Sequence, residues 1–430
     1  MPTIIQGALS SGLGNLSDTN YGYDYPEGLD LKPGSAVHKK LKDLVLRRAK
    51  ASHSIMSKRY SAWNEVDRTL TTYIPLSEKE RITRESDNPE KFRKPVSVVV
   101  PYSYATLETL LTHLTSRFLG RTVFKYAGRS AEDLVGAHLL TEVVRLQTQR
   151  GKAGLALHTM FRDSLAYGIG PVAVTWDRKV AKKAVKEPAG YMSLLKGFIQ
   201  QGFTRSSTEH VVFEGNVMKN IDPYCVLPDP DVSVHKLSDG DFFGWVERTS
   251  MLNLLSKEQM DDEVFNVKYL KHMGGRKSTV VGQNNDHRQI KWGGKDSLGE
   301  DIKQEVDVIY MYVRLIPKEV GVGQSEYPEI WLVALAGDEI VVECRPLGLN
   351  HGQIPATISA PDFDGYSITP MSRLETVYGL QSTLDWLFSS HVNNVKKAIN
   401  DMLIVDPYLV NMKDLENPEF GKLIRLRRAT

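Results

Sequence analysis

The chain has 430 residues, of which 41% are hydrophobic and 25% charged, and its formal net charge is +2. These values are ordinary for a folded protein, and the length exceeds that of one average domain. The small net charge neither favours nor excludes nucleic acid, so a charged partner has to be inferred from local patches. The two cysteines, Cys225 and Cys344, exclude a disulfide framework, and we expect both to be reduced.

No segment is typical of a membrane or secreted protein. Residues 1–25 lack the basic start and the apolar core of a signal peptide. The longest clean apolar run, Ile330 to Ala336, is far shorter than a bilayer span. We therefore expect a soluble protein that is made in a reducing compartment and has no membrane partner.

Helices dominate the first part of the chain. Residues 1–37 are rich in Gly, Ser, Asn and Tyr and show no helical period, so we expect an N-terminal arm. Apolar residues spaced three or four apart then predict four helices, the second opened by Pro101. These helices cover residues 38–73, 101–119, 130–149 and 155–167. Gly168 and Gly170 end the fourth helix, and Pro171 to Trp176 alternates as a strand does.

The next part of the chain is rich in strands. Strands are predicted over residues 210–217, 306–316, 329–336 and 339–344, with Gly337-Asp338 as a tight turn before the last. A short helix is predicted over 251–259, and residues 272–303 are a polar, glycine-rich loop. Residues 191–203 are amphipathic and favour a packed hairpin or helical insert over membrane contact. Helices and strands in this order predict an α+β fold.

The segment from Gly379 to Pro407 carries the longest helical pattern. Its apolar residues recur for about seven turns, and its other face carries amides and lysines. We predict a long amphipathic helix that packs on protein through Leu380, Leu384, Leu387, Val395 and Met402. The ordinary alternative is a helix of a globular domain.

No motif nominates catalysis, a cofactor or a metal. No Gly-Lys pair is followed by Ser or Thr, which excludes a phosphate-binding loop of the usual pattern, and the histidines are dispersed. Gly168-Ile-Gly170 and Gly321-Val-Gly323 are interpreted as turns. A calcium loop of the EF-hand type beginning at Asp229 is excluded by Val234 and Gly240. A looser cation site formed by Asp229, Asp231, Asp239 and Asp241 stays open as a weaker alternative.

Basic residues gather in three places, on residues 179–186, at Lys396 and Lys397, and near the end of the chain at Lys422, Arg425, Arg427 and Arg428. Each group is most simply a solvated face, and weak contact with phosphates regardless of base sequence is the alternative. The final residues, LIRLRRAT, are typical of a strand cut off within a sheet. We therefore expect the sequence to be part of a longer protein.

Four segments in this order resemble the portal proteins, or head-to-tail connectors, of tailed double-stranded DNA bacteriophages. They are RYSAW (59–63), FRDSLAYGIGPVAVTWD (161–177), NIDPYCVLPDPDV (220–232) and GLQSTLDWLFSSHVNNVKKAIND (379–401). WVERTSMLNLLSKEQ (245–259) follows the third segment, and the likeness extends over residues 38–430. Each segment alone is weak, because helix-glycine-strand joints are common, and the order of the four carries the resemblance.

The resemblance implies a ring of about twelve subunits with an α/β wing, long stem helices, a β-rich clip and a crown, although nothing here looks like a crown. It implies the following division: 1–37 arm, 38–245 wing, 246–304 short helix and glycine-rich excursion, 305–360 clip-like region, 361–402 connector and stem-like helix, and 403–430 a truncated return into the wing. Asn393, Lys396, Lys397 and Asn400 would then lie near the channel or a subunit boundary, and Lys422, Arg425, Arg427 and Arg428 would contact DNA.

The resemblance also implies partners and a location. The subunit would bind copies of itself, double-stranded DNA without sequence preference, the large terminase subunit, tail adaptor proteins and the major capsid protein. It would be made in the host cytoplasm and reside at the portal vertex of the virion, where DNA is packaged and ejected. No cofactor or enzymatic activity is expected. The alternatives are a capsid or tail-tube subunit and, in another class, an enzyme whose site is dispersed in sequence.

Overall fold

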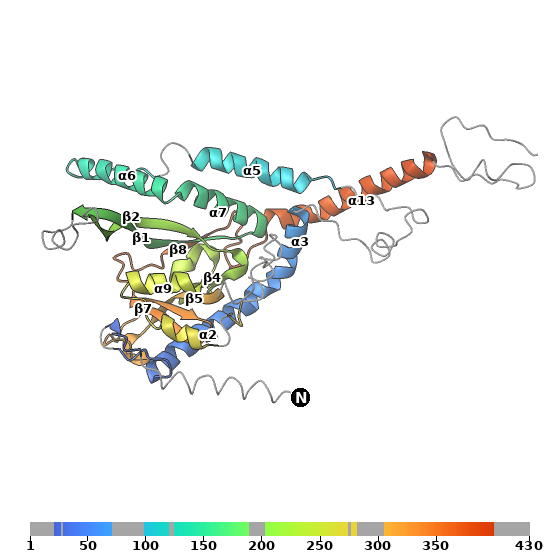
Figure 1. Ribbon diagram of the computed structural model, residues 1–430. Coiled ribbons are helices and arrows are strands. Elements are labelled where there is room, and N and C mark those ends of the chain that lie inside the picture. The colour runs from blue at the N-terminus through green and yellow to red at the C-terminus, as the bar shows by residue number, and fades with distance from the viewer. Residues whose placement is uncertain are drawn as a thin grey trace, which may run out of the picture. The chain divides into compact units, whose positions relative to one another are not determined.

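The computed structural model describes residues 21–26, 29–70, 99–119, 124–188, 203–273, 277–281 and 305–399. Helices and two antiparallel sheets are both present (Figure 1), which confirms the α+β class. The chain divides into two compact units. Unit 1 comprises residues 1–71 and 102–378, and unit 2 comprises residues 72–101 and 379–430. None of the described helices is both long enough and apolar enough to cross a bilayer.

The first predicted helix is divided by a tighter turn. α2 (Ala36–Met56) leads through η2 (Ser57–Arg59) into α3 (Tyr60–Leu70). Ser35 caps α2, because its side chain accepts the backbone N–H of His38 at 3.2 Å. The apolar stripe of α2 is buried, as expected for helical spacing against a core, and it consists of Leu41, Val45, Ala49 and Met56.

Three further helices lie where the apolar pattern predicts them. They are α5 (Tyr102–Phe118), α6 (Asp133–Arg150) and α7 (Ala153–Tyr167). Gly168 ends α7 with φ of 82°, a conformation that favours glycine, and a Cβ there would lie 2.5 Å from the carbonyl oxygen of Pro370. The interpretation of Gly168-Ile-Gly170 as a turn is therefore confirmed, with Gly168 also required for close packing.

The first sheet is mostly a two-stranded ribbon. β1 (Gly170–Pro188) pairs antiparallel with β2 (Phe203–Asn220) along almost its full length. β8 (Ala356–Ser359) pairs only with residues 170–173 of β1. α6 and α7 pack against the ribbon (Figure 1). The sequence predicted much shorter strands because the lysine-rich continuation of β1 has the composition of a solvated segment, not of a strand.

The second sheet holds most of the core. Its order is β3 (Val226–Pro228), β4 (Phe242–Ser250), β5 (Glu305–Leu315), β6 (Glu329–Ala336) and β7 (Ile340–Pro346), all antiparallel neighbours. α2 packs on β3, β6 and β7, and α9 (Met251–Met260) packs on β4. The expected boundary at residue 245, between the wing and the 246–304 segment, falls inside β4. β4 pairs with β5, so strands from the expected wing and from the expected clip-like region lie in one sheet.

Short elements complete unit 1. They are η3 (Pro223–Cys225), η4 (Val234–Asp239), η5 (Val267–His272) and α12 (Pro317–Val320). The long helix α13 (Arg373–Ile399) begins six residues earlier than the predicted segment and crosses the division between the units at residue 378. Cys225 and Cys344 are buried free thiols, as expected, and burial raises the pKa of Cys344 to about 12.

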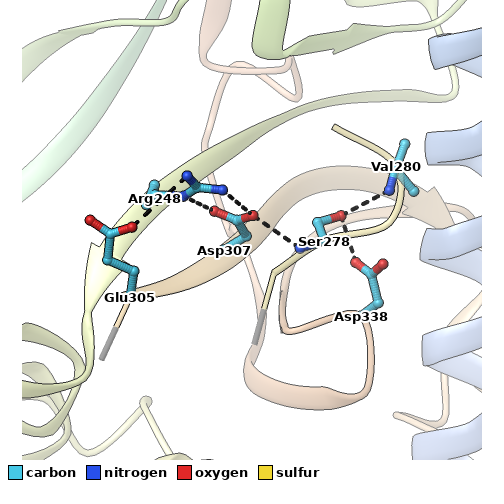
Figure 2. A network of polar contacts seen from close by, with 6 residues as sticks. All are labelled: Arg248, Ser278, Val280, Glu305, Asp307 and Asp338. Carbon is cyan, nitrogen blue, oxygen red and sulfur yellow. Dashed lines mark hydrogen bonds and ion pairs between the residues drawn. The ribbon is translucent and has the colours of Figure 1, made fainter. Parts of the chain in front are cut away.

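A buried polar network fixes part of the predicted 272–303 loop to the second sheet (Figure 2). Asp307 on β5 binds the guanidinium of Arg248 at 2.8 Å and accepts the backbone N–H of Ser278 at 3.0 Å. Asp338, in the tight turn before β7, accepts the hydroxyl of Ser278 at 2.7 Å and the backbone N–H of Thr279 at 2.6 Å. Residues 277–281 are therefore an ordered part of unit 1 and not a simple excursion.

Candidate functional site

A buried carboxylate joins three helical segments of unit 1. Asp67 of α3 accepts the hydroxyl of Tyr167 at 2.6 Å through Oδ1 and the hydroxyl of Tyr224 at 2.8 Å through Oδ2. The ring of Trp63 lies edge-on to both tyrosines, with centroids 5.8 Å from Tyr167 and 5.3 Å from Tyr224. Trp63 is fully buried. Because the carboxylate oxygens are bonded to hydroxyls in an aromatic core, this arrangement is a structural anchor.

The first turn of α13 is attached to the same helix. Arg59, just before α3, forms a 2.5 Å ion pair with Glu375. Ser372 and Glu375 form a capping box, in which each backbone N–H donates to the other's side chain at 3.1 Å. Tyr378 donates its hydroxyl to Glu65 of α3 at 2.9 Å, and partial burial together with this bond raises the pKa of Tyr378. The start of the long helix is thus fixed in unit 1.

These contacts bring together three of the four segments that carry the sequence resemblance and the first turn of the helix on which the fourth lies. Trp63 belongs to the first segment, Tyr167 to the second and Tyr224 to the third. Glu375 belongs to the helix that carries the fourth. We call this cluster of Arg59, Trp63, Asp67, Tyr167, Tyr224 and Glu375 the motif junction. The first three segments are therefore joined physically, and their shared feature is packing, not catalytic chemistry.

Helix α6 leaves its apolar residues in solvent. None of its residues is buried. The side that faces the molecule carries one larger apolar residue, Val144, and otherwise small or polar residues, among them Ala137, Thr141 and Thr148, all of which are half-buried. The opposite side carries Val135, Leu139, Val143 and Leu146, which are 49–69% exposed. An exposed apolar stripe of this length is typical of an interaction surface.

Within unit 2, residues 379–399 of α13 resemble α6, because polar residues are buried and apolar residues are exposed. Gln381 is 5% exposed and donates its amide to the carbonyl oxygen of Val100, and Asp385 accepts the N–H of Val100 at 3.0 Å. Leu380 and Leu387 are 72% and 56% exposed, and Leu384 and Val395 are exposed as well. The described residues do not cover this stripe, so the prediction that it packs on protein stays a prediction.

The predicted channel or boundary residues are only partly described. Asn393 is half-buried on α13. Lys396 and Lys397 belong to the same helix, but their side chains lie outside the described residues. Asn400, Met402, Lys422, Arg425, Arg427 and Arg428 lie wholly outside them. The proposed roles of these residues in lining a channel or contacting DNA stay predictions.

The alternative cation site at Asp229 is not supported by the geometry. The carboxylate of Asp229 is buried and accepts the backbone N–H groups of Asp231 and Asp241 at 3.1 and 2.7 Å. These bonds close the proline-rich turn, so they occupy the oxygens that an ion would need. Over the parts of the chain that the structure describes, no group of three or more His, Cys, Asp or Glu residues could hold a metal ion.

The basic segment after Trp176 forms the outer part of the ribbon. Lys179 is exposed and lies 3.3 Å from Asp177 and over the ring of Phe213. The side chains of Lys182, Lys183 and Lys186 lie outside the described residues. Lys179 is therefore already paired locally, as expected for a solvated face.

Sequence reasoning missed the residues that build the motif junction and the outer face of α6. Ser372-Arg-Leu-Glu375 before an apolar run is a capping-box signal, and it could have placed the true start of α13. No comparable signal marks Asp67, because only the fold shows that its partners come from residues about 100 and 157 positions away. A scan against models of protein families and a search of curated proteins both give no match.

Proposed function

We propose that this chain is a portal subunit, a non-enzymatic component of a ring through which double-stranded DNA is packaged and ejected. The proposal rests on the order of the four sequence segments and on the exposed faces of the long helices. In it, the ring lies at the portal vertex of the virion and contains about twelve subunits related by head-to-tail contacts. The terminase, tail adaptors and major capsid protein are its partners.

The observation that carries the proposal is the exposed stripe of α13. This helix has 27 residues, its first turn is fixed by Arg59 and Ser372, and beyond residue 379 its leucines face solvent. Exposing several large apolar side chains along one helix costs about 1.5–3 kcal/mol each relative to burial. A ring in which each copy covers the stripe of its neighbour removes that cost in every subunit.

The motif junction supports the same proposal mechanically. A subunit that transmits force between a motor and a capsid needs rigid attachment of its long helix. The base of α13 is held by the ion pair of the junction and, next to it, by the Ser372–Glu375 capping box and the bond from Tyr378 to Glu65. Bonds of this kind fix orientation more than they add stability, because the cost of desolvating a largely buried ion pair offsets much of its attraction.

The assembly test compares two substitutions on α13. Purified wild-type protein should form closed rings in negative-stain electron micrographs and one dominant high-mass species in mass photometry. Leu387→Asp should leave the single chain folded but prevent ring closure, because a carboxylate then meets the neighbour's apolar surface. Ser382→Asp, on another side of the same helix, is the matched control and should still form rings.

Other outcomes would contradict the proposal. Shells or open tubes would favour a capsid or tail-tube subunit, and a monomer at every concentration that turns over a substrate would favour an enzyme. Rings formed equally well by Leu387→Asp would show that the α13 stripe is not the ring contact.

The DNA test is a salt titration with two duplexes of unrelated sequence. We expect weak binding, equal for both, whose affinity falls with a log–log slope near −0.9 for each phosphate contacted. A conduit has to let DNA slide, so strong individual phosphate contacts would oppose its function. Tight binding of one duplex that persists at high salt would contradict the proposed role.

A further inference from the structure

The exposed face of α6 carries an ordered pattern of charge as well as apolar residues. Glu132 precedes the helix with φ of −68° and ψ of −33°, so it continues the helical geometry. At 100° per residue, Glu132 and Arg150 fall on the side of the apolar stripe, one at each end of it. Both are exposed. Glu142 lies at one edge of this face, within 20° of Val135, and is paired with Arg145 of the same helix at 2.6 Å. Apart from that internal ion pair, the face carries an acid, four apolar residues and a base in order along the helix.

This pattern is complementary to its own reverse. When a second copy of the face is laid antiparallel and centred near residue 141, Glu132 of one copy meets Arg150 of the other. Val135 meets Leu146, and Leu139 meets Val143. The macrodipoles of the two α6 helices also point in opposite directions in this arrangement, which favours it. In a parallel arrangement the two carboxylates would meet each other, and so would the two guanidinium groups, which disfavours that pairing.

We propose that the outer face of α6 pairs antiparallel with α6 of a second copy of this chain, about a two-fold axis near residue 141. Such a contact is isologous, whereas the contacts that close a ring are head-to-tail. The two kinds of contact therefore use different surfaces. This inference rests on the proposed ring, in which case the α6 contact joins subunits of two different rings. If no ring forms, the same contact joins two free subunits.

The size of the face sets the strength of the pairing. α6 has 18 residues and is roughly 27 Å long, so one helix pair covers less than the ~800 Å² per partner of a standard stable interface. Free subunits should consequently pair weakly and only at high concentration. Two facing rings repeat the contact at every subunit, and the repeated contacts strengthen the association by multivalency.

A charge-exchange experiment tests the antiparallel geometry. Glu132→Arg and Arg150→Glu each place like charges opposite one another, so each single variant should lose pairing by about tenfold or more. The double variant Glu132→Arg/Arg150→Glu restores opposite charges within its own pairs and should pair with itself as the wild type does. It should not pair with the wild type. Sedimentation velocity measures pairing of free subunits, and electron micrographs of separately assembled, then mixed, tagged rings measure pairing of rings.

Two further variants control the result. Lys271→Glu changes an exposed charge on η5 and should leave pairing unchanged. Leu139→Asp should abolish pairing in both assays without lowering the melting temperature, because the residue is exposed in the single chain. Circular dichroism confirms that all variants are folded before pairing is measured.

The outcomes separate this contact from the ring itself. Rings that never pair in wild-type protein would overturn the α6 contact and leave the portal proposal standing. Pairing of free subunits that obeys the charge exchange, in a protein that never forms rings, would support the contact and contradict the portal proposal. Equal pairing of the double variant with itself and with wild type would overturn the antiparallel geometry.

Discussion

Helices α2 and α6 are amphipathic helices of similar length with opposite relations to the molecule. The apolar stripe of α2 is fully buried on the five-stranded sheet, with Leu41 at 0% exposure. The stripe of α6 faces solvent, with Leu139 at 61% exposure, and mostly small or polar residues face the ribbon instead. The periodicity of apolar residues thus identifies a face that prefers to be covered, but it does not say whether the cover comes from the same chain.

The difference follows from what each helix lies on. The sheet beneath α2 offers an apolar surface from five strands, most of whose residues are buried. The ribbon beneath α6 has only two strands over most of its length and offers little apolar area. An isolated two-stranded ribbon is only marginally stable in water, so it cannot bury a full leucine stripe. The comparison can be tested by changing each helix separately.

The largest expected effect is the difference in unfolding free energy between the same substitution, leucine to alanine, made on α2 and on α6. Leu41→Ala on α2 should lower the free energy of unfolding by about 2–5 kcal/mol, because it removes buried surface and leaves a cavity. Leu139→Ala on α6 should change it by about 0.5 kcal/mol or less, because the side chain is already exposed. Urea unfolding of both variants under conditions that keep the chain monomeric measures the difference. Equal losses would show that α6 is covered within the single chain.

The next effect concerns the polar residue on the buried side of α2. His38 is 3% exposed, and its Nε2 accepts the N–H of Val341 at 3.2 Å. Burial lowers the pKa of His38 to about 4, whereas in the unfolded chain it is about 6.5. Between these pH values His38 is protonated only in the unfolded state. Its contribution to the free energy of unfolding is therefore fully present above about pH 6.5 and is lost as the pH drops toward 4.

The total loss attributable to His38 should be about 3 kcal/mol. Unfolding curves of the wild type and His38→Gln, recorded at several pH values from 7 to 4, isolate its contribution, because other groups titrate in both proteins. The variant should show a shallower decline over that window. Parallel declines in the two proteins would mean that His38 is not held neutral by burial.

A smaller effect is expected at the base of α13. Ser372→Ala removes the cap that accepts the N–H of Glu375, and it should cost about 1 kcal/mol. The matched control, Ser382→Ala, changes an exposed serine inside the same helix and should have little effect. Thermal unfolding followed by circular dichroism is sufficient to measure both. A loss at Ser382 as large as that at Ser372 would argue against the capping box.

The smallest expected effect is a gain in stability. Gly379 lies inside α13, and a Cβ there would meet nothing within 4 Å, so Gly379→Ala should stabilise the helix by roughly 0.5–1 kcal/mol. Gly168→Ala is the contrasting variant, because its positive φ and the nearby Pro370 carbonyl oppose a side chain. It should be destabilising. Melting temperatures that move in the same direction for both variants would contradict the assigned backbone geometries.

The sequence predicted the elements better than their arrangement. Helical spacing located α2, α5, α6 and α7 closely, and the Gly337-Asp338 turn has positive φ at both residues, as a two-residue hairpin turn requires. The pairing of β1 with β2 beyond Trp176 was missed, because polar lysine-rich strands carry no burial signal. The pairing of β4 with β5, across the expected boundary at residue 245, was not predicted either, because pairing between distant segments is not visible in a local pattern.

The candidate site was predictable only in outline. The resemblance selected three segments that meet at the motif junction and a fourth on the helix that begins there. Asp67, which joins Tyr167 to Tyr224, carries no local signal of its role, whereas Glu375 is marked only by its capping box with Ser372. The stripe of α13 was identified from its spacing. Its exposure was not, since a helical period gives the apolar side of a helix and leaves open which molecule covers it.

The long-range anchor of α13 has a consequence for the order of folding. Starting a helix is unfavourable, whereas extending one is easy, so a fixed first turn acts as the nucleus for the rest. Here that turn depends on Arg59, which lies 316 residues earlier in the chain than its partner Glu375. The capping box is local, but the ion pair joins the turn only after the segment around Arg59 has folded onto it. We therefore expect the leucine stripe to be held most firmly on chains whose unit 1 is already folded.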